Sequence, residues 1–319
     1  MCVDFLFFCV VAGLAFANGA NDNFKGVATL WGGGDLSYRQ AWIVANGATL
    51  LGALLAVYLG AEVAKMFSGK HIVNADVLAS SGFAIAFAAG AAGTVFLATI
   101  LRYPISTTHS ILGSLAGAGV ALSYGSVNLQ PLIKSGALPL LMSPLIAASM
   151  TFVLWKTIGR YFSFAETSSL RRTLHVLSGS AVCFSRAVND TPKIASIALL
   201  GGAAGMSHIT VYVSIGVVMT FGGVLFARRI AQVMGKEITQ MNAEEGLTAN
   251  AVTAFLVIFA SKLGLAVSTT HVSVGALFGI GAENGKAHKK KILQIILSWV
   301  LTLPTAFILA FVIAKLSAM

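Results

Sequence analysis

Charged residues are scarce in this chain of 319 residues. They make up 10% of the sequence, whereas a soluble domain carries about 25%. Hydrophobic residues make up 57%, and the mean hydropathy is +0.85. Apolar stretches of the ~20 residues that a membrane span needs recur along the whole chain. The composition therefore predicts an all-α polytopic membrane protein and excludes a soluble domain with a single anchor.

Several functional signatures are also absent. The sequence has no Walker motif, no haem-attachment motif and no HExxH motif, which argues against an ATP-driven pump. Its three cysteines, Cys2, Cys9 and Cys183, have no metal-ligand spacing and form no evident disulfide framework. We therefore expect no enzyme, no catalytic residues and no cofactor.

The net charge of +10 does not indicate a nucleic-acid partner, because the basic residues do not form a soluble basic face. They lie in short gaps between apolar segments, notably 156–172 and 283–291. The positive-inside rule makes such gaps cytoplasmic. We expect an integral, multi-pass protein of the plasma or inner membrane, with the lipid bilayer as its surroundings.

An internal repeat organises the chain. Residues 21–25, Asn-Asp-Asn-Phe-Lys, recur 168 residues later as Asn-Asp-Thr-Pro-Lys at 189–193. Residues 106–109, Ser-Thr-Thr-His, recur 162 residues later at 268–271, and a small-xxx-small glycine pair follows each copy. Two motifs in the same order at similar spacing indicate two related halves.

The boundary between the halves is the polar stretch near residue 165, which gives an N-terminal transmembrane repeat, 1–160, and a C-terminal one, 170–319. About five apolar segments fall in each half. We expect helix breaks near 17–23 and 187–193, and half or re-entrant helices after each Ser-Thr-Thr-His motif. Inverted repeats with broken helices are typical of secondary transporters. The parity of crossings in each half, which decides whether the halves are inverted, stays open at this point.

The two aspartates of the repeat, Asp22 and Asp190, lie in apolar segments, where a carboxylate costs ~2.5–3.5 kcal/mol on insertion scales. Such a group persists where it faces an ion, a partner or water. With Asn21 and Asn189 they form a candidate sodium site. The alternative is an ion pair with the lysine three residues further on, which would only neutralise the carboxylate.

The Ser-Thr-Thr-His motifs open two glycine-rich helices. Helix N-termini present free N–H groups and the positive end of the dipole, so they bind anions, and hydroxyl groups add donors. The predicted anion contacts are Ser106, Thr107, Thr108, Ser268, Thr269 and Thr270. Ordinary helix capping is the alternative. For His109 and His271 we expect packing and hydrogen bonding rather than metal ligation.

These motifs resemble those of the inorganic phosphate transporter family (PiT), which includes sodium- or proton-coupled phosphate symporters and a related sulfate permease. The resemblance rests on Gly-Ala-Asn-Asp-Asn-Phe-Lys-Gly at 19–26, on 189–194 and on both Ser-Thr-Thr-His motifs, and it covers nearly the whole chain. It implies inverted repeats, alternating access, a homodimer, and phosphate and cations bound at the repeat interface. Asp22 and Asp190 would then belong to the substrate site, and Na⁺ or H⁺ would be the coupling ion.

One departure from the family pattern bears on coupling. Lys25 and Lys193 stand where the family usually has asparagine, and Arg186-Ala187-Val188 stands where it usually has His-Gly-Ala. An ammonium group is a compact point charge on a flexible stem. We therefore hypothesise that the two lysines take over the charge role of bound sodium. The alternative is that both ammonium groups snorkel away from the site.

The cargo is not decided by these residues alone. Hydroxyl groups and helix N-termini suit sulfate as well as phosphate. An anion channel is a further alternative, although a channel needs a continuous pore with weak sites, and paired broken helices favour a secondary active transporter.

Overall fold

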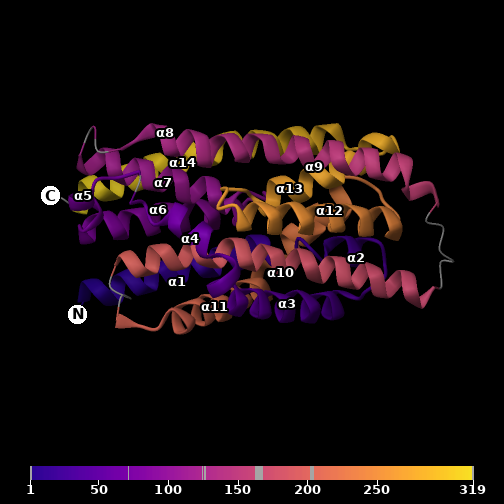
Figure 1. Ribbon diagram of the computed structural model, residues 1–319, viewed down its shortest axis with the longest axis horizontal. Helices are drawn as coiled ribbons and strands as arrows, with labels where there is room; N and C mark the ends of the chain where they lie inside the picture. Colours follow the sequence, from indigo (N-terminus) through magenta and orange to yellow (C-terminus); the bar gives the residue numbers. More distant parts are fainter. Residues whose placement is uncertain are drawn as a thin grey trace.

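The computed structural model describes residues 2–70, 72–123, 125, 127–161, 168–201 and 205–317, and these form an almost entirely helical bundle (Figure 1). The α-helices are α1 Cys2–Asp22, α2 Ala28–Gly32, α3 Tyr38–Leu59, α4 Ala61–Phe67, α5 Ala75–Leu78, α6 Ser81–Ile100, α7 Thr107–Leu122, α8 Leu129–Pro131, α9 Leu138–Thr157, α10 Ser169–Leu200, α11 His208–Gln232, α12 Ala243–Lys262, α13 Thr269–Glu283 and α14 Lys289–Ser317. Short π-helical segments, η1 Leu132–Ala137 and η4 Val233–Glu237, adjoin α9 and α11. The described residues contain no strand beyond isolated bridges.

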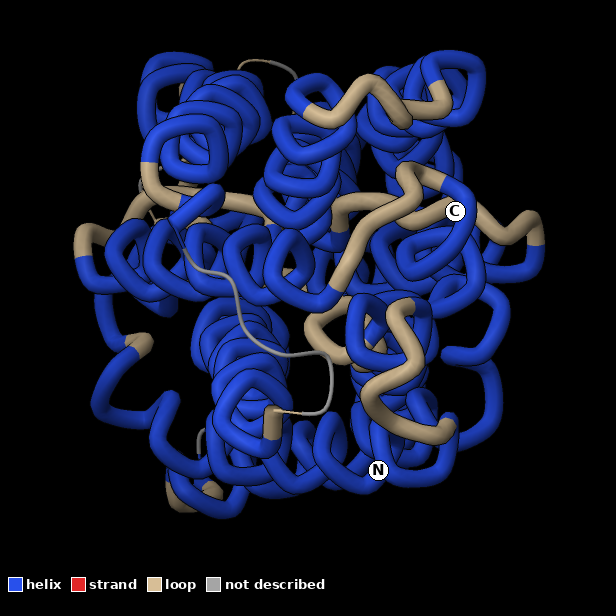
Figure 2. The backbone as a smooth tube through the Cα atoms, turned by 90° about the vertical axis from the view of Figure 1, so that its right-hand side faces the viewer, coloured by secondary structure: helices blue, strands red, loops and turns tan. Residues whose placement is uncertain are grey.

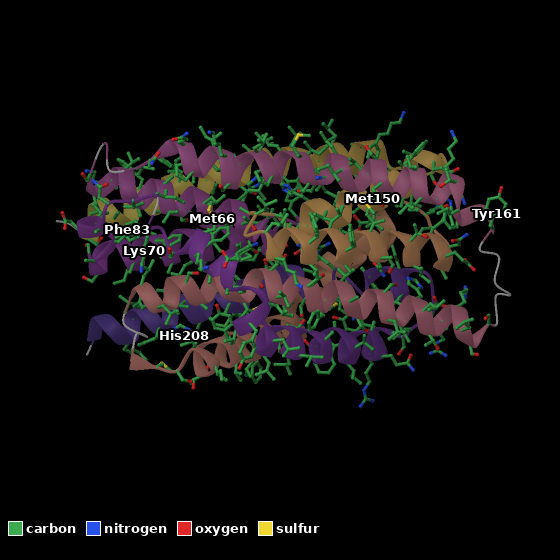
Figure 3. All side chains as sticks on the ribbon, in the orientation of Figure 1. Met66, Lys70, Phe83, Met150, Tyr161 and His208 are labelled. Atoms are coloured by element: carbon green, nitrogen blue, oxygen red, sulfur yellow. The ribbon has the colours of Figure 1, made fainter. Side chains whose placement is uncertain are left out.

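Most helices run along the long axis of the bundle and are seen end-on in Figure 2. In Figure 1, α1, α6 and α7 lie in the left half, α2, α12 and α13 lie in the right half, and α10 runs the full length. Figure 3 marks the ends, with Tyr161 at the right and Phe83 and His208 towards the left. The helix ends that border the two basic gaps, the end of α9 with the start of α10 and the end of α13 with the start of α14, lie towards the right-hand end, as a shared cytoplasmic side requires.

Seven helices in the described part of the chain are long and apolar enough to cross a membrane: α1, α3, α6, α9, α11, α12 and α14. The prediction of an all-α polytopic membrane protein is confirmed. With 16 and 15 residues, α7 and α13 are each only ~24 Å long, short of a ~30 Å hydrocarbon core. They are the short helices expected after the Ser-Thr-Thr-His motifs.

Helix starts are encoded locally. Ser37 and Gln40 form a capping box at the start of α3, and Asn242 and Glu245 form another at the start of α12. Large apolar side chains face outward along the long helices, as in α14, where Leu301 is 63% exposed. An apolar exterior of this extent suits contact with lipid.

The predicted helix breaks have different outcomes. The first is present, since α1 ends at Asp22 and residues 23–27 form turns before α2 begins. The second prediction is wrong, because α10 continues without interruption through 187–193. Pro192 lies inside α10, where its missing N–H leaves one helical acceptor, the carbonyl of Val188, without its usual donor.

The two halves of the sequence interlock. Helix α7 packs along α14, and α13 packs along α9, so each short helix lies against a long helix from the other half. Glycines allow this approach: a Cβ at Gly117 would lie 2.2 Å from the carbonyl oxygen of Phe307, and one at Gly275 would lie 2.3 Å from that of Pro144. The small-xxx-small pairs therefore permit backbone contact between helices.

Gly117→Ala tests this packing. Because the added methyl group would meet backbone rather than a movable side chain, we expect the free energy of unfolding to fall by about 1–3 kcal/mol, measured by thermal or denaturant unfolding in detergent. Gly93→Ala on α6 is the matched control, because its nearest neighbour would be Leu309 Cδ1 at 3.7 Å. Equal stability of the two variants would contradict the close contact of α7 with α14.

Candidate functional site

The two Ser-Thr-Thr-His motifs meet in the interior of the bundle. Thr108 Oγ1 donates a hydrogen bond of 3.0 Å to the carbonyl oxygen of Val267, the residue before the second motif. Thr270 Oγ1 donates one of 2.6 Å to the carbonyl oxygen of Ile105, the residue before the first. Each motif is thus tied to the chain that leads into the other, which places the N-termini of α7 and α13 side by side.

Serine hydroxyls cap both helices. Ser106 Oγ accepts from the backbone N–H of His109 at 3.1 Å, and Ser268 Oγ accepts from that of His271 at 3.3 Å. The hydroxyl of Thr269, at the first position of α13, is buried and has no hydrogen-bond partner among the described residues. The first N–H groups of a helix also have no intrahelical acceptor. The helix ends therefore hold unused donors in a buried position.

Lys25 lies in the turns between α1 and α2, and its side chain is enclosed by oxygen atoms. Its Nζ forms an ion pair with Asp22 and donates to Asn21 Oδ1 at 3.2 Å, to the Ile105 carbonyl at 3.3 Å and to the Thr270 hydroxyl. The residue is 2% exposed. The carbonyl is available because the chain is not helical between α6 and α7.

Lys193 repeats this arrangement from α10. Its Nζ lies 3.2 Å from Asp190 Oδ1 and donates to the Val267 carbonyl at 3.0 Å and to Thr108 Oγ1 at 2.7 Å. The side chain is fully buried. Both lysines therefore point into the site and do not snorkel. Both ion pairs with aspartate, given above as the alternative to a sodium site, are present.

The asparagines of the repeat brace these surroundings. Asn21 Nδ2 donates to Thr99 Oγ1 at 2.9 Å and to the Tyr103 carbonyl at 3.0 Å, beside the break between α6 and α7. Asn189 Nδ2 donates to the Val267 carbonyl at 3.2 Å, and its Oδ1 accepts from Ser261 Oγ at 3.2 Å. Each asparagine thus fixes the non-helical segment that supplies the carbonyl for its lysine.

Two residues at the centre of the site were not predicted. Asn18 Nδ2 lies 3.1 Å from Asp22 Oδ2, 3.1 Å from Asp190 Oδ2 and 2.9 Å from Thr107 Oγ1, so it bridges the two carboxylates. Arg186, which is 1% exposed, donates from Nη1 to Asn18 Oδ1 at 2.9 Å.

The arginine also donates from Nη2 to the side chains of Asn23 and Thr49, at 3.0 Å each. A sequence signal existed for this pair. Arg186 follows Asn18 by the same 168 residues that separate the two aspartates, and an arginine within an apolar segment is as costly as an aspartate.

The charged groups of the site leave an excess of positive charge. Two carboxylates, Asp22 and Asp190, face three cations, Lys25, Lys193 and Arg186, which gives one net positive charge when all five are ionised. In surroundings of low dielectric constant an uncompensated charge is costly. The site is therefore complementary to a bound anion.

The two histidines pack behind the helix starts. Their rings lie 4.7 Å apart, and the ring of His271 lies 3.8 Å from that of Trp299. His271 Nδ1 lies 3.1 Å from the Leu140 carbonyl oxygen. The described residues contain no group of three or more His, Cys, Asp or Glu side chains that could hold a metal ion.

Comparison with known proteins identifies relatives over the whole chain. The model of the Phosphate transporter family matches residues 18–169 and 163–310. The "Probable low-affinity inorganic phosphate transporter" of Mycobacterium bovis is 27% identical over 94% of this chain and 75% of its own length. The "Inorganic phosphate transporter 2-1, chloroplastic" of Arabidopsis thaliana is 25% identical over 93% of this chain and 69% of its own length.

A solved structure has the same fold. It is titled "The sodium-dependent phosphate transporter", and it superposes with a TM-score of 0.87 over 100% of this chain and 99% of the other, at 22% sequence identity.

A double-mutant cycle tests the buried ion pair. Lys25→Met leaves the Asp22 carboxylate without its cation, so we expect the free energy of unfolding to fall by about 3–5 kcal/mol. Asp22→Asn should cost a similar amount, and Asp22→Asn/Lys25→Met clearly less than the sum. The matched control is the exposed pair Glu62–Lys65, which has the same i,i+3 spacing and should show little coupling. Additive effects in the buried cycle would contradict the ion pair.

Proposed function

The chain belongs to the phosphate transporter family, and we propose that it carries inorganic phosphate across the membrane by alternating access, with the anion held at the N-termini of α7 and α13. The observation that carries this proposal is the convergence of two helix N-termini, unused donors and a net positive charge in the interior of a membrane protein. Helix N-termini supply backbone N–H groups and a favourable dipole to a tetrahedral oxyanion.

The aspartates favour phosphate over sulfate. Phosphate at neutral pH retains a hydroxyl that can donate to a carboxylate, whereas sulfate has no proton to donate. Asp22 Oδ2 and Asp190 Oδ2 both lie 3.1 Å from Asn18 Nδ2, so two such acceptors stand beside the helix N-termini. Sulfate would lie beside two carboxylates without being able to donate a hydrogen bond to either of them.

We propose that this chain does not couple phosphate transport to sodium. Lys25 Nζ and Lys193 Nζ each sit among carboxylate, carbonyl and hydroxyl oxygens, which is the surrounding that a bound cation would need. We infer that the tethered ammonium groups occupy the positions of coupling cations. Transport then proceeds by proton coupling, exchange or facilitated movement.

The arrangement of helices supports alternation between two halves. The helices α7 and α13 begin beside one another and lie in opposite halves of the bundle (Figure 1). This is the disposition expected of inverted repeats 1–160 and 170–319 that meet at a central site. The homodimer implied by the family resemblance stays a prediction.

Uptake of radiolabelled phosphate into proteoliposomes tests cargo and coupling together. We expect uptake that excess sulfate does not displace, and a rate that replacing external sodium with potassium changes by less than about fivefold, the lower end of ordinary coupling effects. Lys25→Asn/Lys193→Asn should alter this cation dependence, and Lys65→Asn, on the surface, should not. Full sodium dependence that is unchanged in the double variant would refute the role of the lysines.

Thr269→Val tests the anion cradle. A hydrogen bond to a charged group contributes about 1.5–3 kcal/mol, so we expect phosphate affinity, measured by calorimetry or uptake, to fall at least about tenfold. Stability should not fall, because the hydroxyl has no hydrogen-bond partner among the described residues.

The matched control is Thr151→Val on α9, which removes another buried hydroxyl that has no partner in the described part of the chain. Unchanged phosphate affinity in Thr269→Val, or an equal loss in both variants, would argue against anion binding at the start of α13.

A further inference from the structure

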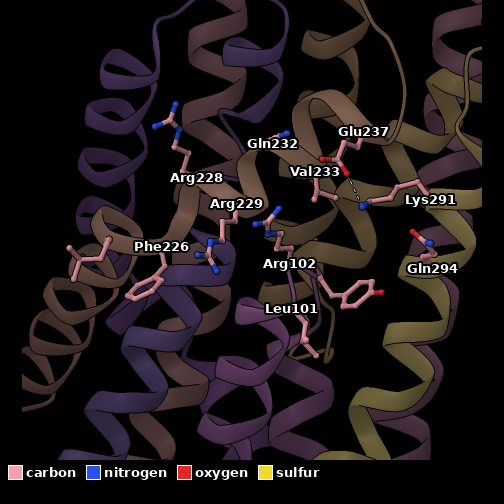
Figure 4. A pocket seen from close by; sticks show the side chains of 12 residues that line it. Leu101, Arg102, Phe226, Arg228, Arg229, Gln232, Val233, Glu237, Lys291 and Gln294 are labelled. Carbon is pink, nitrogen blue, oxygen red and sulfur yellow. Dashed lines mark ion pairs between the residues drawn. The ribbon is translucent and has the colours of Figure 1, made fainter.

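A basic groove lies outside the site, between the end of α6 and the helices α11 and α14. It has a volume of about 530 Å³, and its lining includes Arg102, Arg228, Arg229 and Lys291 (Figure 4). Lys291 is paired with Glu237 at 2.7 Å, whereas no ion pair holds any of the three arginines within the described part of the chain. The guanidinium group of Arg228 lies over the Tyr38 ring, 5.6 Å from its centre. The groove therefore presents the guanidinium groups of Arg102 and Arg229 without a carboxylate partner among the described residues.

The groove continues into an apolar one. A second cavity, of about 380 Å³, runs between α6 and α14 and shares Leu101, Tyr103 and Gln294 with the first. Leucines line it from both helices, and Leu297 and Leu301 are 52% and 63% exposed. A basic cavity that opens into an apolar channel along two membrane helices has the polarity of a phospholipid, with an anionic head group and acyl chains.

The position of the groove along the bundle agrees with such an occupant. Arg228 and Arg229 lie near the C-terminal end of α11, and Lys291 lies in the first turn of α14, which begins at the right-hand end of the bundle in Figure 1. Arg102 directly follows α6 and lies nearer the middle of the bundle. The apolar cavity extends from there along α14 to Thr305, away from that end. Basic pockets between membrane helices on the cytoplasmic side bind anionic head groups.

From this complementarity we propose that an anionic phospholipid binds in the groove, with its phosphate on Arg102 and Arg229 and an acyl chain between α6 and α14. The guanidinium fork suits phosphate oxygens. Figure 4 shows the side chain of Arg102, from the segment after α6, next to that of Arg229, from α11.

The segment that follows α6 connects the groove to the transport site. Arg102 has a φ of 64°, a left-handed conformation that is strained for a residue with a side chain. The next residue, Tyr103, accepts from Asn21 through its carbonyl, and Ile105 supplies the carbonyl bound by Lys25. A head group bound to Arg102 therefore stabilises the non-helical segment whose carbonyl oxygens accept from Asn21 and Lys25.

Lipid retention measured by native mass spectrometry tests the binding. The full chain is extracted from vesicles of equimolar phosphatidylglycerol and phosphatidylcholine, and the retained lipids are counted. We expect enrichment of phosphatidylglycerol, reduced about 25-fold in Arg102→Gln/Arg229→Gln, since each basic residue contributes a factor of about 5. Lys289→Gln/Lys290→Gln, which removes the same charge at the same end outside the groove, should leave the enrichment unchanged.

A second variant keeps the charges and blocks the acyl channel. Ala98→Phe fills the apolar cavity and should also lower lipid retention, so the test does not depend on the arginine variant alone. Equal retention in the arginine variant and its lysine control would overturn the proposal.

Free phosphate is the competing occupant. If millimolar inorganic phosphate displaced the retained phosphatidylglycerol, or if Arg102→Gln/Arg229→Gln lowered phosphate uptake equally in phosphatidylcholine vesicles and in mixed vesicles, the groove would be an entry path for cargo. That result would overturn the lipid site while leaving the proposed transport of phosphate in place.

Discussion

Two ammonium groups buried in the interior of a membrane protein constrain the rest of this structure. Each must be surrounded by oxygen atoms, because an unpaired charge in a medium of low dielectric constant is too costly to keep. Carbonyls inside a regular helix are already engaged by backbone N–H groups, and the chain leaves helical geometry beside each lysine. It does so before α7 and before α13, where Ile105 and Val267 supply the carbonyls. The short helices, their positions and their serine caps follow from that requirement.

The same constraint ties the two halves of the chain together. Each lysine also contacts a threonine from the other half, Thr270 for Lys25 and Thr108 for Lys193. These threonines simultaneously donate to the carbonyls that lead into the opposite short helix. Backbone contacts at glycines hold α7 on α14 and α13 on α9, again between halves. The site therefore exists only when both halves of the chain are folded against one another.

Much of this site could be predicted from the sequence, because repetition carries information. Polar residues that recur at one offset in apolar segments, such as Asp22 and Asp190, indicated the site residues, and triplets of hydroxyl residues indicated the helix starts. The continuity of α10 could not be predicted, because a proline two residues after a buried aspartate suggests a break unless the surrounding partners are known. Asn18 and Arg186 were missed for a related reason: they are a repeat pair of different residue types, and only the fold reveals that they bond to each other.

In our proposal, the ammonium groups of the two lysines replace coupling cations beside an anion site. Phosphate affinity of the purified protein, measured by calorimetry at constant ionic strength while choline replaces sodium, tests this claim most directly. If Lys25 and Lys193 already fill the cation positions, the dissociation constant for phosphate will be the same in both salts. An affinity that rises about tenfold or more with sodium, a coupling free energy of ~1.4 kcal/mol, would show that a free cation still completes the site and would contradict the account.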